Sequence, residues 1–255
     1  MMVATIATVD WLELHVRRWL RYVRAAMPDA KVGLVLYCGS MDQLDPETCV
    51  AYEFDALELV NPAQAGMLEF DRVRMSMTEL FRVEQCLYVD ADADVYDDLS
   101  DLFEYVGDRS LLWVPSPVVN KHWLDDAQRL GYGVPKDCAN NGLLVLRKDW
   151  GAEWAAAVEK CGGLGKDGKK THGLTAFNAM LKDNPDLHHA LPPETSVTWF
   201  DVDRWGDARV LQYCGKHGQE LRIGLEAKWK AMEMVKGLAK TAHETCDRIA
   251  AEVTG

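Results

Sequence analysis

Residues 86–89 are a short apolar stretch that leads directly into closely spaced aspartates. Apolar residues in a run of this length predict a buried strand. Asp90 and Asp92 follow the strand at once. Carboxylates this close repel one another and raise each other's pKa unless a cation lies among them. Because α/β sheets bind ligands at the carboxyl ends of their strands, the run predicts a divalent ion, Mg²⁺ or Mn²⁺, that holds the phosphates of a nucleotide.

Three other interpretations of the acidic run remain open. Its acids match positions 1, 3, 5 and 12 of a Ca²⁺ loop of the EF-hand type, but Val95 stands where that loop needs glycine, and a strand precedes the run instead of a helix. A phosphatase with an aspartate nucleophile also begins with a strand and Asp-x-Asp, but there the motif follows the first strand. A solvated acidic turn is the simplest alternative in an acidic protein.

Length, hydrophobic content and net charge limit the kinds of molecule that the chain is expected to bind. The chain has 255 residues, enough for one large domain or two small ones, and 48% of them are hydrophobic. The net charge is −12, from 28 basic and 40 acidic residues. Because a nucleic-acid backbone needs a basic face, this balance excludes nucleic acid as the main partner. A nucleotide stays possible, since a metal ion can neutralise its charge.

Cysteine usage and the N-terminus indicate the compartment. The seven cysteines are scattered and form no CxxC pair, so neither a disulfide framework nor a zinc site is predicted. Free thiols are typical of a reducing compartment. The N-terminus lacks a basic segment followed by an apolar run, and no apolar run is long enough to cross a membrane. We therefore expect a cytoplasmic protein with no transmembrane span.

Apolar and turn-forming residues alternate in a pattern typical of an α/β fold. Asp10 is the expected N-cap of the first helix, and Asp45 opens a short helix. Strands are predicted at residues 3–8, 31–37, 57–60, 86–89, 110–114, 142–146 and 210–213, and helices at 11–26, 68–82, 150–161, 175–181 and 225–253. This order predicts a mixed, mainly parallel sheet flanked by helices.

The last predicted helix is amphipathic and sets the domain division. Its apolar residues recur at spacings of three and four. We expect one domain over residues 1–222 and a C-terminal helix over 223–255 that packs on that domain or on a second copy of the chain. A helix on a membrane surface is the alternative.

Four blocks of the chain resemble one enzyme family. They are the turn at residues 8–11, the acidic strand end at 87–92 with Asp-Leu-Phe at 101–103, the Asn-Asn-Gly and apolar strand at 139–146, and the late segment 211–216. In these blocks the sequence is similar to glycosyltransferases of the GT-A fold, in the retaining group (family 8) that contains glycogenin and the bacterial lipopolysaccharide galactosyltransferases. The spacing of the second block agrees with the family without a gap.

The resemblance implies a reaction and a site. The reaction is metal-dependent transfer of a sugar from a UDP-linked nucleotide sugar, with retention, to a glycan, protein or small-molecule acceptor. A metal, Mn²⁺ or Mg²⁺, lies on Asp90, Asp92 and either Gln212 or His217. The other residues implied in donor binding are Thr8, Asp10, Trp11, Arg74, Ala91, Gly215 and Lys216, and those implied near the reacting sugar are Asn140, Asn141 and His172.

Two departures from the family keep other functions open. Gln212 stands where the family has a histidine ligand, and Gly173-Leu174 where it has Asp-Gln near the sugar. A nucleotide-sugar-binding pseudoenzyme or lectin-like module would tolerate both changes. A nucleotide-sugar pyrophosphorylase is the other alternative, but it opens with a glycine-rich phosphate loop, and residues 8–14 contain no glycine.

Overall fold

The structure, a computed structural model, describes residues 1–64, 67–105, 107–116, 138–162 and 173–228. The chain divides into two compact units, Met1–Gln212 and Tyr213–Gly255. The sequence predicts the division after residue 222, so the first unit ends earlier than expected. Within the second unit, residues 215–228 are helical. Most of the C-terminal helix predicted at 225–253 lies outside the described residues.

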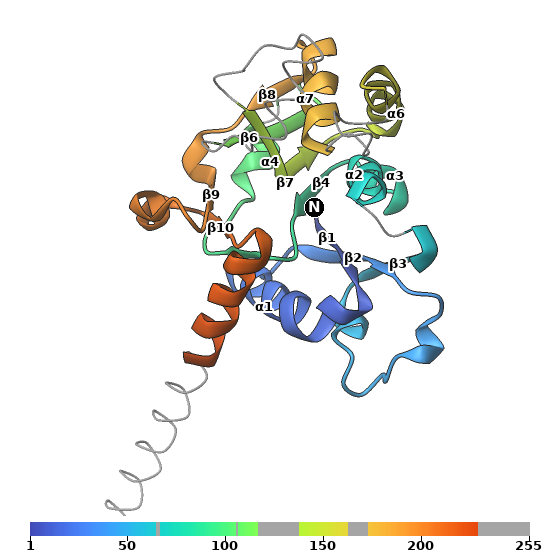
Figure 1. The fold of residues 1–255 in the computed structure, drawn as a ribbon, viewed down its shortest axis with the longest axis vertical. Coiled ribbons are helices and arrows are strands. Elements are labelled where there is room, and N and C mark those ends of the chain that lie inside the picture. Colours follow the sequence, from blue (N-terminus) through green and yellow to red (C-terminus); the bar gives the residue numbers. More distant parts are fainter. Residues whose placement is uncertain (65–66, 106, 117–137, 163–172, 229–255) are drawn as a thin grey trace, which may run out of the picture. The chain divides into compact units, whose positions relative to one another are not determined.

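A seven-stranded sheet forms the centre of the first unit, in the order β3-β2-β1-β4-β7-β6-β8 (Figure 1). β7 runs antiparallel to its neighbours β4 and β6, whereas the other neighbouring strands are parallel. The predicted mixed, mainly parallel sheet is therefore confirmed. The strands are β1 (Met2–Thr8), β2 (Lys31–Tyr37), β3 (Ala56–Val60), β4 (Cys86–Val89), β6 (Leu111–Ser116), β7 (Cys138–Leu146) and β8 (His188–Ala190).

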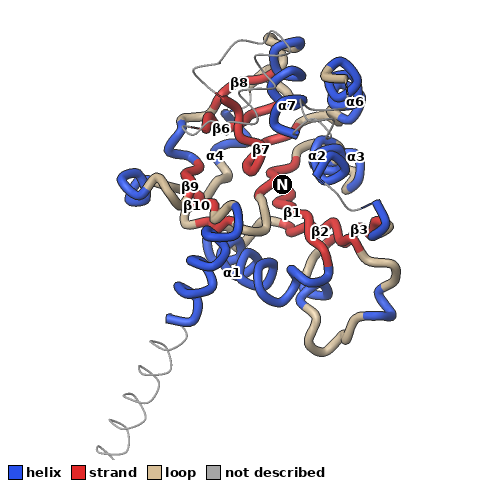
Figure 2. The backbone as a smooth tube through the Cα atoms, in the orientation of Figure 1, coloured by secondary structure: helices blue, strands red, loops and turns tan. Residues whose placement is uncertain are grey.

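The acidic run continues from β4 into β5, a strand of a second, three-stranded sheet; the other two strands, β9 and β10, are labelled in Figure 2. The order of this sheet is β5 (Ala93–Val95), β10 (Val210–Gln212) and β9 (Ser196–Thr198). β10 runs antiparallel to β5, and Gln212 lies opposite Ala93. This register brings a late segment of the chain beside the aspartates that follow β4. Short strands carry little alternation, and of the four three-residue strands only β10 was predicted, whereas β5, β8 and β9 were not.

Helices cover both faces of the large sheet. Alternate residues of β1 belong to different hydrophobic clusters, Val3 to one and Ala4 to the other, as the period of a strand requires. The first cluster includes residues of α1, and the second includes residues of α2, α3, α6 and α7. The helices are α1 (Arg17–Ala26), α2 (Met67–Met75), α3 (Met77–Leu80), α4 (Asp101–Tyr105), α6 (Gly151–Lys160) and α7 (Gly173–Asp183).

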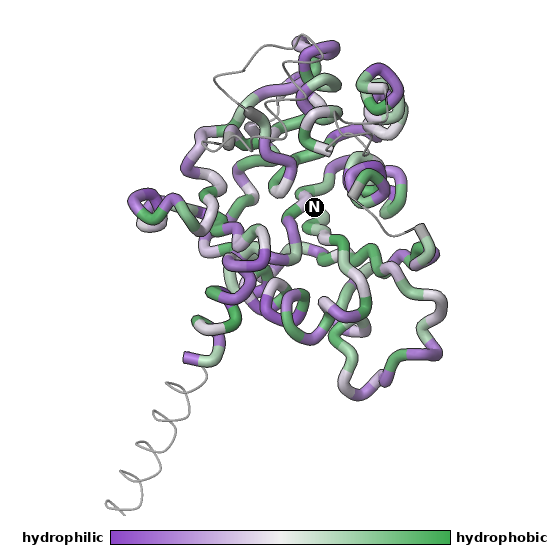
Figure 3. The backbone as a smooth tube through the Cα atoms, viewed as in Figure 1, coloured by the Kyte–Doolittle hydropathy of each residue, from purple (hydrophilic) through white to green (hydrophobic). Residues whose placement is uncertain are grey.

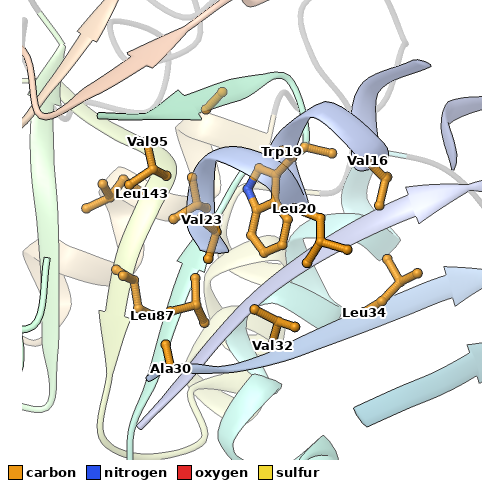
Figure 4. Close-up of a cluster of buried hydrophobic side chains, with 14 of the residues drawn as sticks. Val16, Trp19, Leu20, Val23, Ala30, Val32, Leu34, Leu87, Val95 and Leu143 are labelled. Carbon is orange, nitrogen blue, oxygen red and sulfur yellow. The ribbon is translucent and has the colours of Figure 1, made fainter. Parts of the chain in front are cut away.

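Trp19 lies at the centre of the first cluster (Figure 4). Its side chain is fully buried and packs with Val23 of the same helix against strand residues such as Val32. Hydrophobic segments follow the strands of the sheet, and polar segments lie mostly on the helices and loops around them (Figure 3). This burial holds the strand ends, and therefore the polar residues that follow them, in a fixed arrangement.

The first helical segment begins differently from the prediction. β1 leads without a loop into a 3₁₀ turn, Val9–Trp11, then a π-helix, Leu12–Val16, and then α1. Asp10 lies inside the 3₁₀ turn and makes no cap, because the chain is already helical from Val9. The prediction of an N-cap at Asp10 is therefore wrong.

Two further helix predictions are also wrong in detail. The helix predicted at 68–82 is split into α2 and α3 at Ser76, where the carbonyl of Met75 accepts a hydrogen bond from the backbone N–H of Trp150 instead of continuing the helical ladder. The Asp45 segment forms a turn, in which the Asp45 carboxylate accepts hydrogen bonds from Glu47 N and Thr48 Oγ1. A 3₁₀ turn follows at Val50–Glu53.

Five cysteines of the described part of the chain are free thiols. Four are buried (Cys38, Cys49, Cys86 and Cys161) and Cys214 is exposed. No described helix combines the length and the apolar composition needed to span a membrane.

Candidate functional site

Asp90 lies at the edge of the large sheet where β4 ends. Its backbone N–H donates to the carbonyl of Gly142, at 2.9 Å, which continues the pairing of β4 with β7 by one residue. Its side chain is 29% exposed. β1 runs parallel to β4 and ends at the same edge, where β7 begins. The sheet therefore brings Thr8, Asp90 and the asparagines of β7 to one edge.

The two oxygens of the Asp90 carboxylate have different surroundings. Oδ1 accepts hydrogen bonds from Arg74 Nη2, at 2.9 Å, and from the hydroxyl of Tyr88. Oδ2 points toward Gly142, where an added Cβ would lie only 2.6 Å away. One oxygen is thus held by two side chains, while the other comes close to the backbone of Gly142, an approach that is possible because residue 142 has no side chain.

Arg74 and Tyr88 form the buried support of Asp90. Arg74 is 9% exposed, and its guanidinium carbon lies 4.6 Å from the centre of the Tyr88 ring. Arg74 Nη2 also donates to the Tyr88 hydroxyl, at 3.1 Å. Burial raises the pKa of Tyr88 well above its usual value, so the phenol stays protonated and donates to Asp90. The carboxylate is therefore fixed in orientation before any ligand binds.

Gln212 lies beside Asp90 on the other side of Gly142. The Gly142 Cβ position would be 2.3 Å from Gln212 Nε2. Gln212 Oε1 accepts a hydrogen bond from Asn140 Nδ2 at 2.8 Å, and Nε2 is buried with no hydrogen-bond partner. A carbonyl oxygen has two lone pairs, so Oε1 can still bind a cation. The unpartnered Nε2 is a donor, so it could meet an acceptor atom of a ligand or a water, whereas a cation could bind only Oε1.

The oxygens of Asp90, Asp92 and Gln212 suit a hard divalent cation. Asp92 is 9% exposed, Ala91 between the two acids is 3% exposed, and the pairing of Gln212 with Ala93 places the amide beside this segment. Mg²⁺ and Mn²⁺ prefer carboxylate and amide oxygens. No cluster of three or more His, Cys, Asp or Glu side chains suited to a metal occurs in the described part of the chain. Any ion here would need Gln212, water or a ligand to complete its coordination.

Asp94 belongs to the same acidic run but has a structural role. It is fully buried in β5 and forms an ion pair with Arg18 of α1, whose Nη2 lies 2.5 Å from Asp94 Oδ2. Asp101, further along, pairs with Arg209 at 2.6 Å. These two acids are thus bound to arginines, which contradicts the Ca²⁺-loop alternative, because that loop requires both as ligands.

Asp71 is a second buried carboxylate next to Arg74, and the sequence did not predict it. Its Oδ1 accepts hydrogen bonds from Arg74 Nη1, at 2.8 Å, and from Asn141 Nδ2, at 2.7 Å. The pKa of Asp71 is raised to about 6, chiefly because burial disfavours its charged form; Asp90 also raises the pKa, while Arg74 and the hydrogen bond from Asn141 lower it. Arg74 thus lies between two carboxylates, Asp90 and Asp71.

The residues predicted to surround the nucleobase lie beyond the end of β1. Thr8 is the last residue of the strand and is partly buried, and Asp10 is exposed. The Trp11 ring is partly buried and lies 4.4 Å, centre to centre, from the ring of His15. Trp11 also packs against the first hydrophobic cluster. Both the base-contacting role and a core-packing role are compatible with this position.

The remaining predicted residues fall outside the first unit or outside the described chain. Gly215, Lys216 and His217 belong to the second unit, where they are exposed. His217 Nδ1 lies 3.2 Å from Glu220 Oε2. Gly215 has a φ of +75°, a conformation that favours glycine. His172 lies outside the described residues.

Comparison with solved structures identifies the fold. The chain matches the galactosyltransferase LgtC, solved with donor and acceptor sugar analogues, at 17% identity with a TM-score of 0.64, over 84% of this chain and 87% of that one. It matches the bifunctional glycosyltransferase WbbM at 13% identity and a TM-score of 0.58, over 84% and 46% of the two chains. It matches mouse xyloside xylosyltransferase 1 at 11% identity with a TM-score of 0.56, over 82% of this chain and 96% of that one.

The first unit therefore has the GT-A fold of glycosyltransferases, which confirms the resemblance inferred from the four sequence blocks. No protein-family model and no curated protein sequence matches the chain. At these identities the comparisons establish the fold, and the activity has to be argued from the site.

Three residues of the site carry no clear sequence signal. In the sequence Tyr88 is one of four apolar residues that predict a strand, and Gly142 is the first residue of another predicted strand. Asp71 lies in a helix among the charged neighbours Glu69, Arg72 and Arg74, where an acid is ordinary. The spacing of three between Asp71 and Arg74 was the one usable hint, because residues at this spacing share a helix face.

Proposed function

We propose that this protein is a metal-dependent glycosyltransferase that transfers a sugar from a UDP-linked nucleotide sugar, with retention, to a glycan, protein or small-molecule acceptor. The observation that supports the proposal is that the two oxygens of the Asp90 carboxylate have different surroundings. Arg74 and Tyr88 hold Oδ1, whereas none of the described residues donates a hydrogen bond to Oδ2, which lies near Gly142 and Gln212 at the carboxyl end of β4. α/β folds bind ligands at this edge.

Asp90, Asp92 and Gln212 would hold the metal, Mn²⁺ or Mg²⁺. When bound, such an ion supplies Lewis-acid neutralisation of the diphosphate that departs from the sugar. The protein's own part is to keep the ligands in place beforehand. Asn140 orients the Gln212 amide, and Arg74 and Tyr88 orient Asp90. Preorganised charges need no rearrangement as the transition state forms, which favours catalysis.

Trp11 is the proposed contact of the nucleobase, together with Thr8 and Asp10. The position of this turn at the end of β1 supports the proposal. In a variant that keeps Trp11 and replaces the other tryptophans with phenylalanine, we expect UDP with Mn²⁺ to change the tryptophan fluorescence. Unchanged fluorescence at saturating UDP would assign Trp11 to the core alone.

The test of the proposed reaction is release of UDP. Donor hydrolysis needs no acceptor, so we expect the protein with Mn²⁺ to release UDP from at least one member of a panel of UDP-sugars, faster than the Asp90→Asn/Asp92→Asn double variant does. Cell extracts added as a source of acceptors should accelerate the release further. If no UDP-sugar is cleaved faster than by the double variant, with or without extract, the protein is not a glycosyltransferase of this kind.

A binding module for nucleotide sugars is the second candidate function. Gln212 in place of a histidine ligand, and the absence of a side chain at Gly173, are the observations that favour it. A thermal-shift panel separates the two functions, because a ligand that binds only the folded state raises the melting temperature. Stabilisation by UDP-sugars with Mn²⁺ but no UDP release would identify the binding module.

A further inference from the structure

Asp71 lies where three elements of the candidate site meet. It belongs to α2 and bonds to Asn141 of β7, and its carboxylate packs against Gly173, the first residue of α7. The residue is only 3% exposed. A single oxygen, Oδ1, accepts hydrogen bonds from both Asn141 and Arg74. A carboxylate so buried and so placed connects the residue that supports Asp90 to the residue expected near the sugar.

Gly173 provides the space for this carboxylate. A Cβ at residue 173 would lie 1.8 Å from Asp71 Oδ2, which is closer than two atoms can approach. The amino-terminal end of α7 also favours a negative charge nearby. Asp71 can therefore occupy this position only because residue 173 lacks a side chain.

The bond to Asp71 determines which end of the Asn141 amide faces outward. An ionised carboxylate only accepts hydrogen bonds, so the NH₂ group of Asn141 must face Asp71 and the carbonyl oxygen must point the other way. None of the described residues donates a hydrogen bond to that carbonyl oxygen, and Asn141 keeps 8% of its surface exposed. Asn141 thus presents an acceptor with unused capacity.

We propose that Asp71 is a positioning residue, which orients the Asn141 amide so that its carbonyl oxygen accepts a hydrogen bond from a hydroxyl group of the donor sugar. This inference rests on the proposed function. It implies that Asp71 governs recognition of the sugar and not of the nucleotide, because Arg74 keeps its bonds to Asp90 and Tyr88 when Asp71 is changed.

The test compares UDP with UDP-sugars in the Asp71→Asn variant. An asparagine can face Asn141 with either end of its amide, so the outward group is no longer fixed. By calorimetry with Mn²⁺, we expect the best-bound UDP-sugar to lose about tenfold in affinity, the equivalent of one hydrogen bond, while UDP changes by less than about twofold. The Glu69→Gln variant is the matched control, since it removes an acid from the same helix that pairs only with exposed Arg72.

One further variant keeps the test decisive if Asp71→Asn fails to fold, and a second shows whether Asp71 acts through Asn141. Gly173→Ala keeps every polar side chain but displaces the Asp71 carboxylate, and we expect the same selective loss of UDP-sugar affinity. The Asp71→Asn/Asn141→Ala double variant should bind UDP-sugars no more weakly than Asn141→Ala alone, because Asp71 acts through Asn141.

Several outcomes overturn the inference. An equal loss of UDP and UDP-sugar affinity assigns Asp71 to the support of Arg74, and additive losses in the double variant show that Asp71 acts independently of Asn141. Unchanged UDP-sugar binding in both Asp71→Asn and Gly173→Ala removes any role in recognition. If the wild-type protein binds neither UDP nor any UDP-sugar with Mn²⁺, it is the proposed function that fails, and the inference fails with it.

Discussion

Asp90 and Asp94 belong to one acidic run, and each binds an arginine, yet the two sites differ in what they leave available. Asp94 is 0% exposed, and both of its oxygens accept hydrogen bonds from Arg18. Asp90 has a side chain that is 29% exposed, and Arg74 and Tyr88 bind only one of its oxygens. The first site is complete as a structural ion pair, whereas the second has an oxygen to offer a ligand.

The difference between Asp94 and Asp90 comes from the arginine that each of them binds. Arg18 comes from α1 and is directed into the core, so its pairing with Asp94 joins that helix to the small sheet. Arg74 is shared with Asp71, so Asp90 receives only part of the guanidinium. A motif of alternating aspartates therefore contains one acid that is fully used in a structural ion pair, Asp94, and another four residues earlier, Asp90, with one oxygen outside its ion pair.

The largest expected effect comes from breaking the structural pair. Arg18→Met leaves Asp94 buried without its guanidinium, and removing one partner of a buried pair costs about 3–5 kcal/mol of unfolding free energy. Urea denaturation measures this loss. Arg17→Met is the matched control, because Arg17 is 42% exposed in its pair with Glu13 and should cost less than about 1 kcal/mol. Equal losses in both variants would contradict the structural role of Asp94.

Asp71 is a third acid that binds an arginine, and it is buried like Asp94. Its protonation can be tested by measuring the free energy of unfolding as a function of pH. Its folded-state pKa of about 6 lies above the ordinary value of 3.8, because burial disfavours the charged form. The protonated carboxyl therefore favours the folded state, and its contribution is complete below about pH 3.8 and is lost as the pH rises through 6. Relative to Asp71→Asn, the wild-type protein should lose about 2–3 kcal/mol of unfolding free energy between pH 4 and pH 7. Parallel pH profiles for the two proteins would show that Asp71 titrates normally.

A smaller effect is expected from Gly142→Ala, a substitution that tests the role of Asp90 Oδ2 by steric crowding. Gly142→Ala places a Cβ within 2.6 Å of Asp90 Oδ2 and 2.3 Å of Gln212 Nε2, so the two side chains must move apart. We expect affinity for UDP with Mn²⁺ to fall about tenfold, because misplaced ligands lose about one hydrogen bond's worth of free energy. Gly206→Ala is the control, since an added Cβ meets nothing there. Unchanged affinity in Gly142→Ala would place the ligand away from Asp90 Oδ2 and Gln212.

Local sequence predicted the parts of the site that follow directly from a strand. The apolar strand β4 and the acids after it are contiguous, so Asp90 and Asp92 could be recognised, and the parallel sheet followed from the alternation of elements. The structural role of Asp94 could not be predicted, because its partner Arg18 is 76 positions away. The same holds for Asp71, whose bond to Asn141 spans 70 positions. Such pairs depend on tertiary packing, which a single sequence does not display.

The helix predictions failed where tertiary contacts override local preference. Residues 68–82 have the pattern of one helix, but the backbone of Trp150 takes the carbonyl of Met75 and divides it. Asp10 is a good capping residue by type, yet β1 continues directly into a helical turn. In both places a helical segment was predicted correctly, but the break at Ser76 and the start at Val9 were not.

The most direct test of the central claim is the affinity of UDP with Mn²⁺ in Asp90→Asn, measured by calorimetry. The variant keeps the size of the side chain but removes the charge on Oδ2, so the account predicts a loss of about a hundredfold, with a loss of unfolding free energy below about 1.5 kcal/mol. Asp97→Asn, which changes an acid of the same run that is 68% exposed, should bind as the wild-type protein does. Wild-type affinity in Asp90→Asn, or an equal loss in Asp97→Asn, would contradict the assignment of Asp90 to the donor site.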